Sequence, residues 1–274
     1  LGVEAVAMAD NFRDLPQLIK AVGEWGVEKV MVTHVAPFSK EVFEKAVYLT
    51  ISQASYELMK PFAEEGWEFV KNICYEAYGE HFLGFERRAR KRHEEMWNEA
   101  LKRGYWINLP LFLESLHKLP LFEEVEKAFS EAERIAREYG VELELPSPFP
   151  DARSRSCPYV EKEAAFVRCD GMVSPCAEFA YAHPLWVNAH HKEVYEVFFG
   201  DLRTSSLEEV WDSPAYASFR ELRKRFSQNI PWCGDCVYSS LDCWYVRNNL
   251  RDCMLNEPSC SECLYSVDLA RCNI

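Results

Sequence analysis

The first half of the chain repeats a pattern of apolar positions at helical spacing, then a glycine, then a short apolar run. Two copies are complete, with helical spacing over residues 15–22 and 122–139 and apolar runs over residues 27–35 and 141–145. Gly26 and Gly140 stand where a left-handed C-cap would end each helix, and Asp14 is the candidate N-cap of the first. A repeated helix–glycine–strand unit predicts parallel strands joined by crossover helices, and therefore an α/β fold.

An incomplete copy of this repeat opens the chain. Gly2-Val3-Glu4 begins an apolar run over residues 3–9, yet only Leu1 precedes the glycine and the chain does not begin with Met. We therefore expect the sequence to start within an α/β unit, with preceding strands and helices missing or supplied by another chain. A natural edge strand with a trimmed terminus is the alternative.

A long segment between the two complete copies is helical in pattern. Residues 38–119 combine aromatic residues with alternating charges, which is more than a crossover helix needs. They predict an inserted helical subdomain or lid, although packing helices without a functional part fit the same pattern. The proline-rich stretch 146–151 cannot be regular helix or central strand. We place a domain boundary there, with one domain over residues 1–150 and a second over residues 151–274.

Turn and cap signals predict small elements in the second half. Asp170-Gly171 between two short apolar runs is a strong hairpin signal. Ser206-x-x-Glu209 is a capping box, and a helix is expected over residues 214–226. We interpret His190-His191 as a solvent-exposed loop pair rather than as metal ligands.

The composition is that of an ordinary globular protein. The 274 residues are 48% hydrophobic and 27% charged, and the formal net charge is -13. A surface dominated by carboxylates repels nucleic acid and anionic lipid, so neither is expected as the main partner. No uncharged run reaches the ~18 residues of a membrane span, and no basic start precedes an apolar stretch as in a signal peptide. We therefore expect a cytoplasmic protein.

The distribution of the 11 cysteines is the strongest chemical signal. Only Cys74 lies before Cys157, and the other ten fall between Cys157 and Cys272. Disulfides, structural zinc and iron–sulfur clusters all produce such a density. Disulfides need an oxidising compartment, and nothing here directs export. Zinc suits the Cys-x2-Cys pairs that begin at Cys233 and Cys260, but four ligands close a zinc site and leave six cysteines without a role. Two 4Fe-4S clusters need eight thiolates, which is close to the number present.

These cysteines and the residues around them resemble the SPASM auxiliary-cluster domain of radical SAM maturases. The resemblance rests on Cys157, Gly171 and Cys176, on Gly-Asp-Leu-x3-Ser-Leu-Glu-Glu-Val-Trp-x-Ser-Pro at 200–214, and on the cysteine cluster that follows. Cys-Pro-Tyr-Val-Glu from Cys157, Val-Ser-Pro-Cys ending at Cys176 and Asp-Cys at 252–253 are similar to the subgroup that matures tungsten-cofactor oxidoreductases.

The first half carries a looser resemblance to the same enzymes. Asn11-x3-Leu15-Pro16 and the run that ends at His34 are similar to the later strands of the radical SAM barrel. The resemblance implies the C-terminal part of a radical SAM partial (β/α) barrel with a helical insertion, followed by a small α+β cysteine-rich SPASM-type domain. Asn11 and His34 are cofactor-binding candidates through their place at the C-terminal ends of predicted strands, although ordinary polar residues occur there as well.

The resemblance also implies a set of cluster ligands. Nine cysteines match the family for eight places, namely Cys157, Cys176, Cys233, Cys236, Cys243, Cys253, Cys260, Cys263 and Cys272. The spacing after Cys236 departs from the family pattern, so the division of these cysteines between two clusters is left open. Cys74 and Cys169 are interpreted as structural thiols.

One motif of the family is absent from the chain. Radical SAM enzymes hold a further 4Fe-4S cluster through three cysteines separated by three and two residues, and no such triplet occurs here. This chain alone is therefore expected not to cleave S-adenosylmethionine. S-adenosylmethionine and the third cluster are expected only in a full-length or complemented enzyme.

The function that the resemblance implies is that of an iron–sulfur protein. Two auxiliary 4Fe-4S clusters would relay electrons or bind substrate, and the substrate would be a peptide or the cofactor of a tungsten oxidoreductase. Two alternatives stay open. One is a non-catalytic interaction module whose cysteines bind zinc, and the other is one half of a split enzyme whose partner carries the missing triplet.

Overall fold

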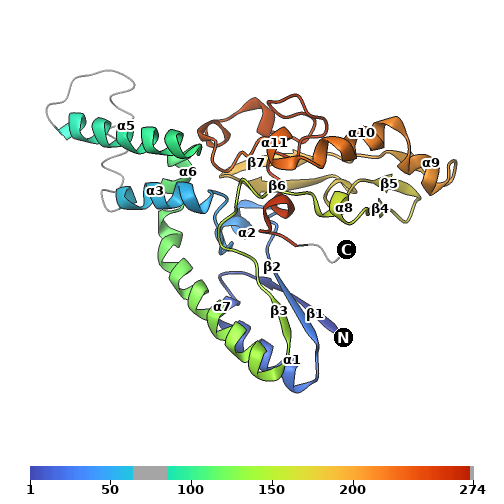
Figure 1. Ribbon diagram of the computed structural model, residues 1–274, viewed down its shortest axis with the longest axis horizontal. Coiled ribbons are helices and arrows are strands. Elements are labelled where there is room, and N and C mark those ends of the chain that lie inside the picture. Colours follow the sequence, from blue (N-terminus) through green and yellow to red (C-terminus); the bar gives the residue numbers. More distant parts are fainter. Residues whose placement is uncertain (64–84, 272–274) are drawn as a thin grey trace.

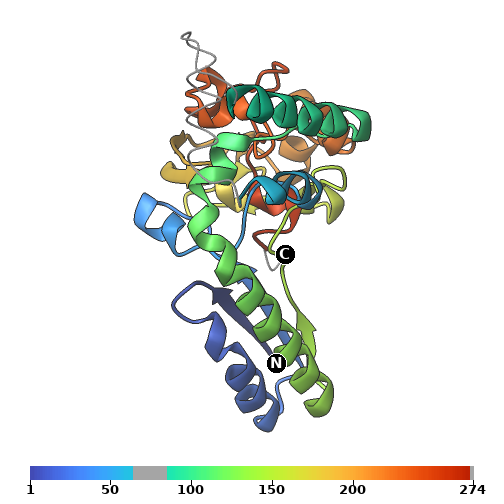
Figure 2. The same cartoon turned by 90° about the vertical axis from the view of Figure 1, so that its left-hand side faces the viewer.

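The computed structural model describes residues 1–63 and 85–271 (Figure 1). They form a sheet region (residues 2–34 and 119–144), a helical region (the described residues of 40–118) and a cysteine-rich region (residues 157–271). The sheet region projects from the rest of the molecule in both views (Figures 1 and 2). Within the described residues, no helix is long and apolar enough to cross a membrane.

A parallel sheet with the order β1-β2-β3 is the centre of the sheet region. Its strands are β1 (Gly2–Ala7), β2 (Lys29–His34) and β3 (Glu142–Glu144). Lys29 is in register with Gly2 on one side and with Glu142 on the other. The repeat in the sequence therefore gives parallel strands, as predicted, and the α/β class is confirmed.

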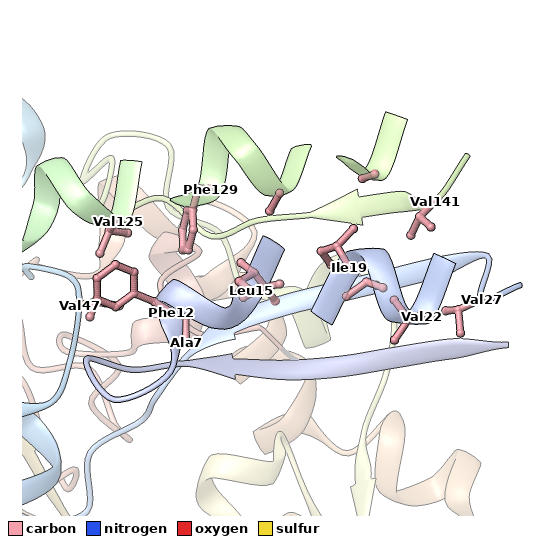
Figure 3. Packing of buried hydrophobic residues seen from close by; sticks show 14 residues of the cluster. Ala7, Phe12, Leu15, Ile19, Val22, Val27, Val47, Val125, Phe129 and Val141 are labelled. Carbon is pink, nitrogen blue, oxygen red and sulfur yellow. The ribbon is translucent and has the colours of Figure 1, made fainter. Parts of the chain in front are cut away.

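Helices α1 (Leu15–Glu24) and α7 (Leu119–Tyr139) cover one face of this sheet (Figure 2). Figure 3 shows Leu15 and Ile19 of α1 gathered with Phe129 of α7 in the buried layer between helices and strands. Burial of each such side chain stabilises the fold by ~1.5–3 kcal/mol. The left-handed residue after α7 is Gly140, with φ 68°, as the C-cap prediction requires.

The expected capping bond from Asp14 is not formed. A short 3-10 helix, η1 (Phe12–Asp14), runs directly into α1, so the Asp14 backbone is itself helical. A side chain on a helical backbone does not reach the first free N–H groups of the helix as an extended N-cap residue does.

The opposite face of the sheet is polar. Lys29 donates to the carboxylates of Glu142 and Glu144 at 3.1 and 2.6 Å, and Glu4 lies on the same face. With residues of the C-terminal segment, among them Arg271, these strands line a groove of about 650 Å³. Parallel sheets usually have apolar side chains on both faces, so this sheet differs from an ordinary doubly covered one.

The helical region follows β2 in the chain. Its described elements are α2 (Lys40–Glu44), α3 (Gln53–Ala63), α5 (Phe85–Arg103), α6 (Leu109–Glu114) and η2 (Leu116–Lys118). Ile51, Met59, Ile107 and Phe112 are fully or nearly fully buried at its centre. The helices agree with the pattern in the sequence, while the role of residues 38–119 as an insertion or lid and the boundary near residue 150 stay predictions. Cys74 lies outside the described residues.

The cysteine-rich region contains many short elements. They are α8 (Pro158–Glu161), β4 (Phe166–Val167), β5 (Met172–Ser174), η3 (Ala177–Phe179), β6 (His183–Val187), β7 (His190–Val194), β8 (Gly200–Asp201), α9 (Leu207–Trp211), α10 (Pro214–Arg223), α11 (Phe226–Asn229), η4 (Val237–Ser240), η5 (Trp244–Val246) and η6 (Leu264–Val267). Strands β4, β5 and β8 form one antiparallel sheet, and β6 pairs with β7.

The hairpin and the capping box are confirmed, and the single long helix is wrong. β4 and β5 flank Gly171, whose φ is 87°, and the Ser206 and Glu209 side chains cap α9 reciprocally. The helix expected over residues 214–226 is α10, which ends at Arg223 because the backbone of Arg225 is not helical. The break lets Phe226 enter the core around the cysteines.

Hydrogen bonds fasten the helical region to the loop of residues 232–240. Nδ2 of the buried Asn108 lies 3.2 and 3.0 Å from the carbonyl oxygens of Gly234 and Cys236, and its Oδ1 accepts from the Leu111 N–H. A Cβ at Gly234 would collide with the Thr50 carbonyl oxygen, so the close approach of the two segments requires glycine.

Replacement of Asn108 by alanine is predicted to destabilise the protein by about 2–3 kcal/mol, because buried carbonyl groups lose their donor. Urea unfolding followed by circular dichroism measures the change. Asn98 on α5 is exposed, and Asn98→Ala is the matched control, expected to change the free energy of unfolding by less than about 0.5 kcal/mol. Equal effects of the two substitutions would contradict this role of Asn108.

Candidate metal centre

Four cysteines from distant stretches of the chain line one cavity. They are Cys157, Cys176, Cys260 and Cys263, called the inner group below. The cavity walls are largely apolar and include Phe179, Leu185, Phe219 and Phe226.

Local structure brings the two halves of the inner group together. Cys157 is the N-cap of α8, and Cys176 follows the β4–β5 hairpin. The Tyr159 hydroxyl accepts from the Ala177 N–H at 3.2 Å, which ties the two stretches. On the other side, the Cys263 N–H donates to the Cys260 carbonyl in the turn before η6. The hairpin therefore returns the chain to Cys157, as its position in the sequence suggests.

Cys157, Cys176 and Cys263 of the inner group favour the neutral thiol unless a cation joins them. Burial raises the pKa of Cys157 to about 11, and the neighbouring Cys260 adds to the shift. Burial, followed by the charges of Cys260 and Cys263, raises the pKa of Cys176 well above its usual value. Burial, followed by the charges of Cys260 and Cys157, raises the pKa of Cys263. A bound metal centre reverses this preference because it deprotonates coordinating thiols.

Four further cysteines form an outer group, Cys233, Cys236, Cys243 and Cys253. The first two lie in one turn, in which the Cys236 N–H donates to the Cys233 carbonyl at 3.1 Å. The pKa of Cys253 is raised by burial first, then by Asp252, Cys236 and Cys243. Cys233 is buried, Cys236 and Cys243 are half-buried, and Cys253 is exposed. This group therefore lies nearer the surface than the inner one.

Neither group surrounds a single point closely. Among residues 1–63 and 85–271, no three His, Cys, Asp or Glu side chains are close enough to hold one metal ion. The inner group is defined by its shared cavity. The outer group is defined by the turn that contains Cys233 and Cys236, and by the effect of Cys236 and Cys243 on the pKa of Cys253.

Among the described cysteines, one belongs to neither group. Cys169 is exposed at the β4–β5 turn. Cys272 lies outside the described residues.

Asn11 and His34, the cofactor-binding candidates at the strand ends, form ordinary contacts with neighbouring residues. Asn11 is exposed and braces its own loop, since its side chain accepts from the Met8 N–H and donates to the Val6 carbonyl, both at 2.8 Å. His34 is 2% exposed, its Nε2 lies 3.0 Å from the Ser147 carbonyl oxygen, and its ring contacts Tyr48. A role of either residue in cofactor binding stays a prediction.

Buried charges surround the inner group, and sequence reasoning missed them. Arg155 donates to the Ile230 and Cys260 carbonyls at 2.8 and 3.3 Å, and burial lowers its pKa to about 10. Arg223 donates to the Cys260 sulfur. The place of Arg155 two residues before Cys157 was the only signal in the sequence.

A carboxylate between the two C-terminal inner cysteines is also buried. Glu262 is paired with Lys192 at 3.0 Å and with His190 at 3.2 Å, and it accepts from the Asn188 amide at 2.6 Å. The pKa of Glu262 lies at about 2 because the charges of Lys192 and His190 outweigh the effect of burial. The interpretation of His190-His191 as a solvent-exposed loop pair is wrong in two respects, since both residues open β7 and His190 lies beside this buried carboxylate, whereas His191 is exposed as expected.

Part of the cysteine-rich region matches a known domain family. Residues 157–237 match SPASM, an iron–sulfur cluster-binding domain. The matched segment contains Cys157 and Cys176 of the inner group and Cys233 and Cys236 of the outer group. The match indicates that this segment belongs to an iron–sulfur cluster-binding domain.

One particular protein is similar over the whole chain. It is the tungsten-containing aldehyde ferredoxin oxidoreductase cofactor-modifying protein of Pyrococcus furiosus, which is 25% identical over 274 residues. Those residues are 100% of this chain and 56% of that protein, so the chain spans about half the length of the curated relative it matches. No solved structure matches the chain. Together the two matches confirm the resemblance to radical SAM/SPASM maturases.

His34 is predicted to make the fold sensitive to acid. Burial lowers its pKa to about 4, whereas an unfolded histidine binds its proton near 6.5. Between these values the unfolded state binds more protons, so stability falls as the pH falls through this window, by roughly 2 kcal/mol between pH 7 and pH 5.

The variant His34→Gln still donates to the Ser147 carbonyl but carries no charge, so it should lose this contribution. Urea unfolding of both proteins at pH 7 and pH 5 isolates it as a difference, since all other titrating groups are shared. A difference between the two proteins that is the same at both pH values would refute the prediction.

Proposed function

We propose that this chain is the cluster-bearing C-terminal portion of a radical SAM/SPASM maturase and that it holds two 4Fe-4S clusters. The observation that carries the proposal is the separation of eight cysteines into an inner and an outer group of four. Four thiolates are the complete ligand set of one such cluster. Nine cysteines match the family, and the ninth, Cys272, is not needed in this assignment.

The chemistry of the inner group fits a cluster. Cys157, Cys176, Cys260 and Cys263 would hold it, in a cavity whose walls are largely apolar. Arg155 and Arg223 supply positive charge beside thiolates that would otherwise be costly to bury. When bound, such a cluster supplies a one-electron carrier of low reduction potential, tuned by burial and hydrogen bonds.

The outer group would hold the second cluster nearer solvent. Cys233 and Cys236 are fixed by the turn that Asn108 fastens, whereas Cys243 and Cys253 come from loops with little regular structure. Its partial exposure suits exchange of electrons with an external donor. The two groups also share Arg155, whose pKa responds to Cys263 and Cys260 of the inner group and to Cys233 of the outer group.

The sheet region supports a place at the end of a partial barrel. Its strands are parallel, α1 and α7 cover one face, and the other face carries Glu4, Lys29 and Glu144 along an open groove. In a barrel, one face of each strand points to the interior and the other to the surrounding helices. We propose that this groove is the portion of the barrel interior contributed by these strands.

We further propose that the complete enzyme modifies the cofactor of a tungsten oxidoreductase, with a peptide as the other candidate substrate. The support is the named role of the Pyrococcus furiosus relative. S-adenosylmethionine and the cluster that binds it would be held by residues outside this sequence, because the three-cysteine motif does not occur in it.

Anaerobic purification tests the two-cluster proposal. We expect a brown protein that absorbs near 400 nm and holds about eight irons per chain. The variants Cys263→Ser and Cys253→Ser should each retain about four irons, because each removes a ligand from one group only. Cys169→Ser is the matched control and should retain all eight.

Metal analysis by mass spectrometry distinguishes the outcomes. Two zinc ions and no iron in a colourless protein would replace this proposal with the zinc-binding interaction module. Loss of every iron on either substitution would reject the division into two independent groups.

A further inference from the structure

Arg223 is the last residue of α10 and reaches into the wall of the inner cavity. Its Nε and Nη2 both lie 3.3 Å from the Cys260 sulfur. Nη2 also donates to the Pro258 carbonyl at 2.7 Å, and Nη1 to the Phe219 carbonyl at 3.2 Å. The guanidinium carbon lies 3.5 Å from the centre of the Phe219 ring. These contacts fix the guanidinium with two of its N–H groups directed at one sulfur.

Within residues 1–63 and 85–271, no carboxylate pairs with this buried guanidinium. Arg223 is 2% exposed, and its hydrogen-bond partners among the described residues are two carbonyl oxygens and the sulfur. Lys192, by contrast, is buried with Glu262 as its counter-ion. A buried cation is stable only when an anion compensates it. The atom in contact with Arg223 that can carry negative charge is the Cys260 sulfur.

In the proposed function, on which this inference rests, Cys260 is a cluster ligand, and its thiolate is the anion that the buried Arg223 requires. A 4Fe-4S cluster with four thiolates carries two negative charges when oxidised. It carries three after it accepts one electron from an external donor such as dithionite. A fixed cation and two N–H donors at a ligand sulfur stabilise the state with the larger negative charge more strongly.

We propose that Arg223 is a positioning residue that raises the reduction potential of the inner cluster through its two hydrogen bonds to the Cys260 sulfur. The outer group differs, since within the described residues none of its sulfurs accepts a guanidinium N–H. Arg223 therefore makes the two clusters unequal, with the inner one easier to reduce than its thiolate ligands alone would make it.

Redox titration of the anaerobic holoprotein, followed by electron paramagnetic resonance, tests this. In Arg223→Gln we expect one of the two clusters to be about tenfold less reduced at its wild-type midpoint. This corresponds to a midpoint about 59 mV more negative. The other midpoint should stay unchanged. Arg223→Lys keeps the charge but not the paired donors, and should shift the same cluster less.

Arg225→Gln is the matched control, because it removes the same charge from an exposed position two residues away. It should leave both midpoints unchanged.

Three results would overturn the inference. The first is two wild-type midpoints in an Arg223 variant that retains eight irons. The second is an equal shift in Arg225→Gln. The third is failure of both Arg223 variants to fold, which would make Arg223 a support of the fold alone. Absence of iron from the wild-type protein would instead reject the proposed function, so the two failures are distinguishable.

Discussion

Binding of a metal centre by the cysteine-rich region depends on negative charge on sulfur atoms inside an apolar cavity. Cys157 and Cys176 approach the cavity from one side, and Cys260 and Cys263 approach it from the other. The same four residues pack in the core that contains Phe226 and Leu264. A metal centre there would therefore join segments that are 84 residues or more apart, using the interior that hydrophobic packing has already formed. Without a cation, burial favours the protonated thiol at Cys157 and Cys176, and the segments are joined by packing.

The segment that carries most of the cysteines contains little regular secondary structure. After α11 the described chain contains only the short 3-10 helices η4, η5 and η6. The backbone hydrogen bonds of this segment are those of turns and short 3-10 helices, so contacts from outside also fix its conformation. Asn108 fastens residues 234–236 to the helical region, and Arg155 binds the Ile230 carbonyl at the start of the segment and the Cys260 carbonyl further along. The buried charges are thus part of the architecture as well as of the electrostatics of the site.

Periodicity and turn chemistry in the sequence were sufficient for the elements that are stable locally. The Gly140 cap, the hairpin at Gly171 and the Ser206 capping box depend on residues close to one another in the chain, and the parallel strands follow from the repeated helix–glycine–strand pattern. The division of the cysteines could not be predicted in this way, because ligand spacing does not reveal which loops meet in space. Arg223 was missed for the same reason. It lies 37 residues before Cys260, on a helix whose end could not be located from helical periodicity.

The central claim is that eight of these cysteines enclose two clusters in two separate groups. Anomalous diffraction at the iron edge, from crystals grown without oxygen, tests it most directly. The account predicts two iron peaks, one among Cys157, Cys176, Cys260 and Cys263 and the other among Cys233, Cys236, Cys243 and Cys253. A single iron peak, or peaks whose sulfur ligands combine cysteines of the two groups, would contradict it.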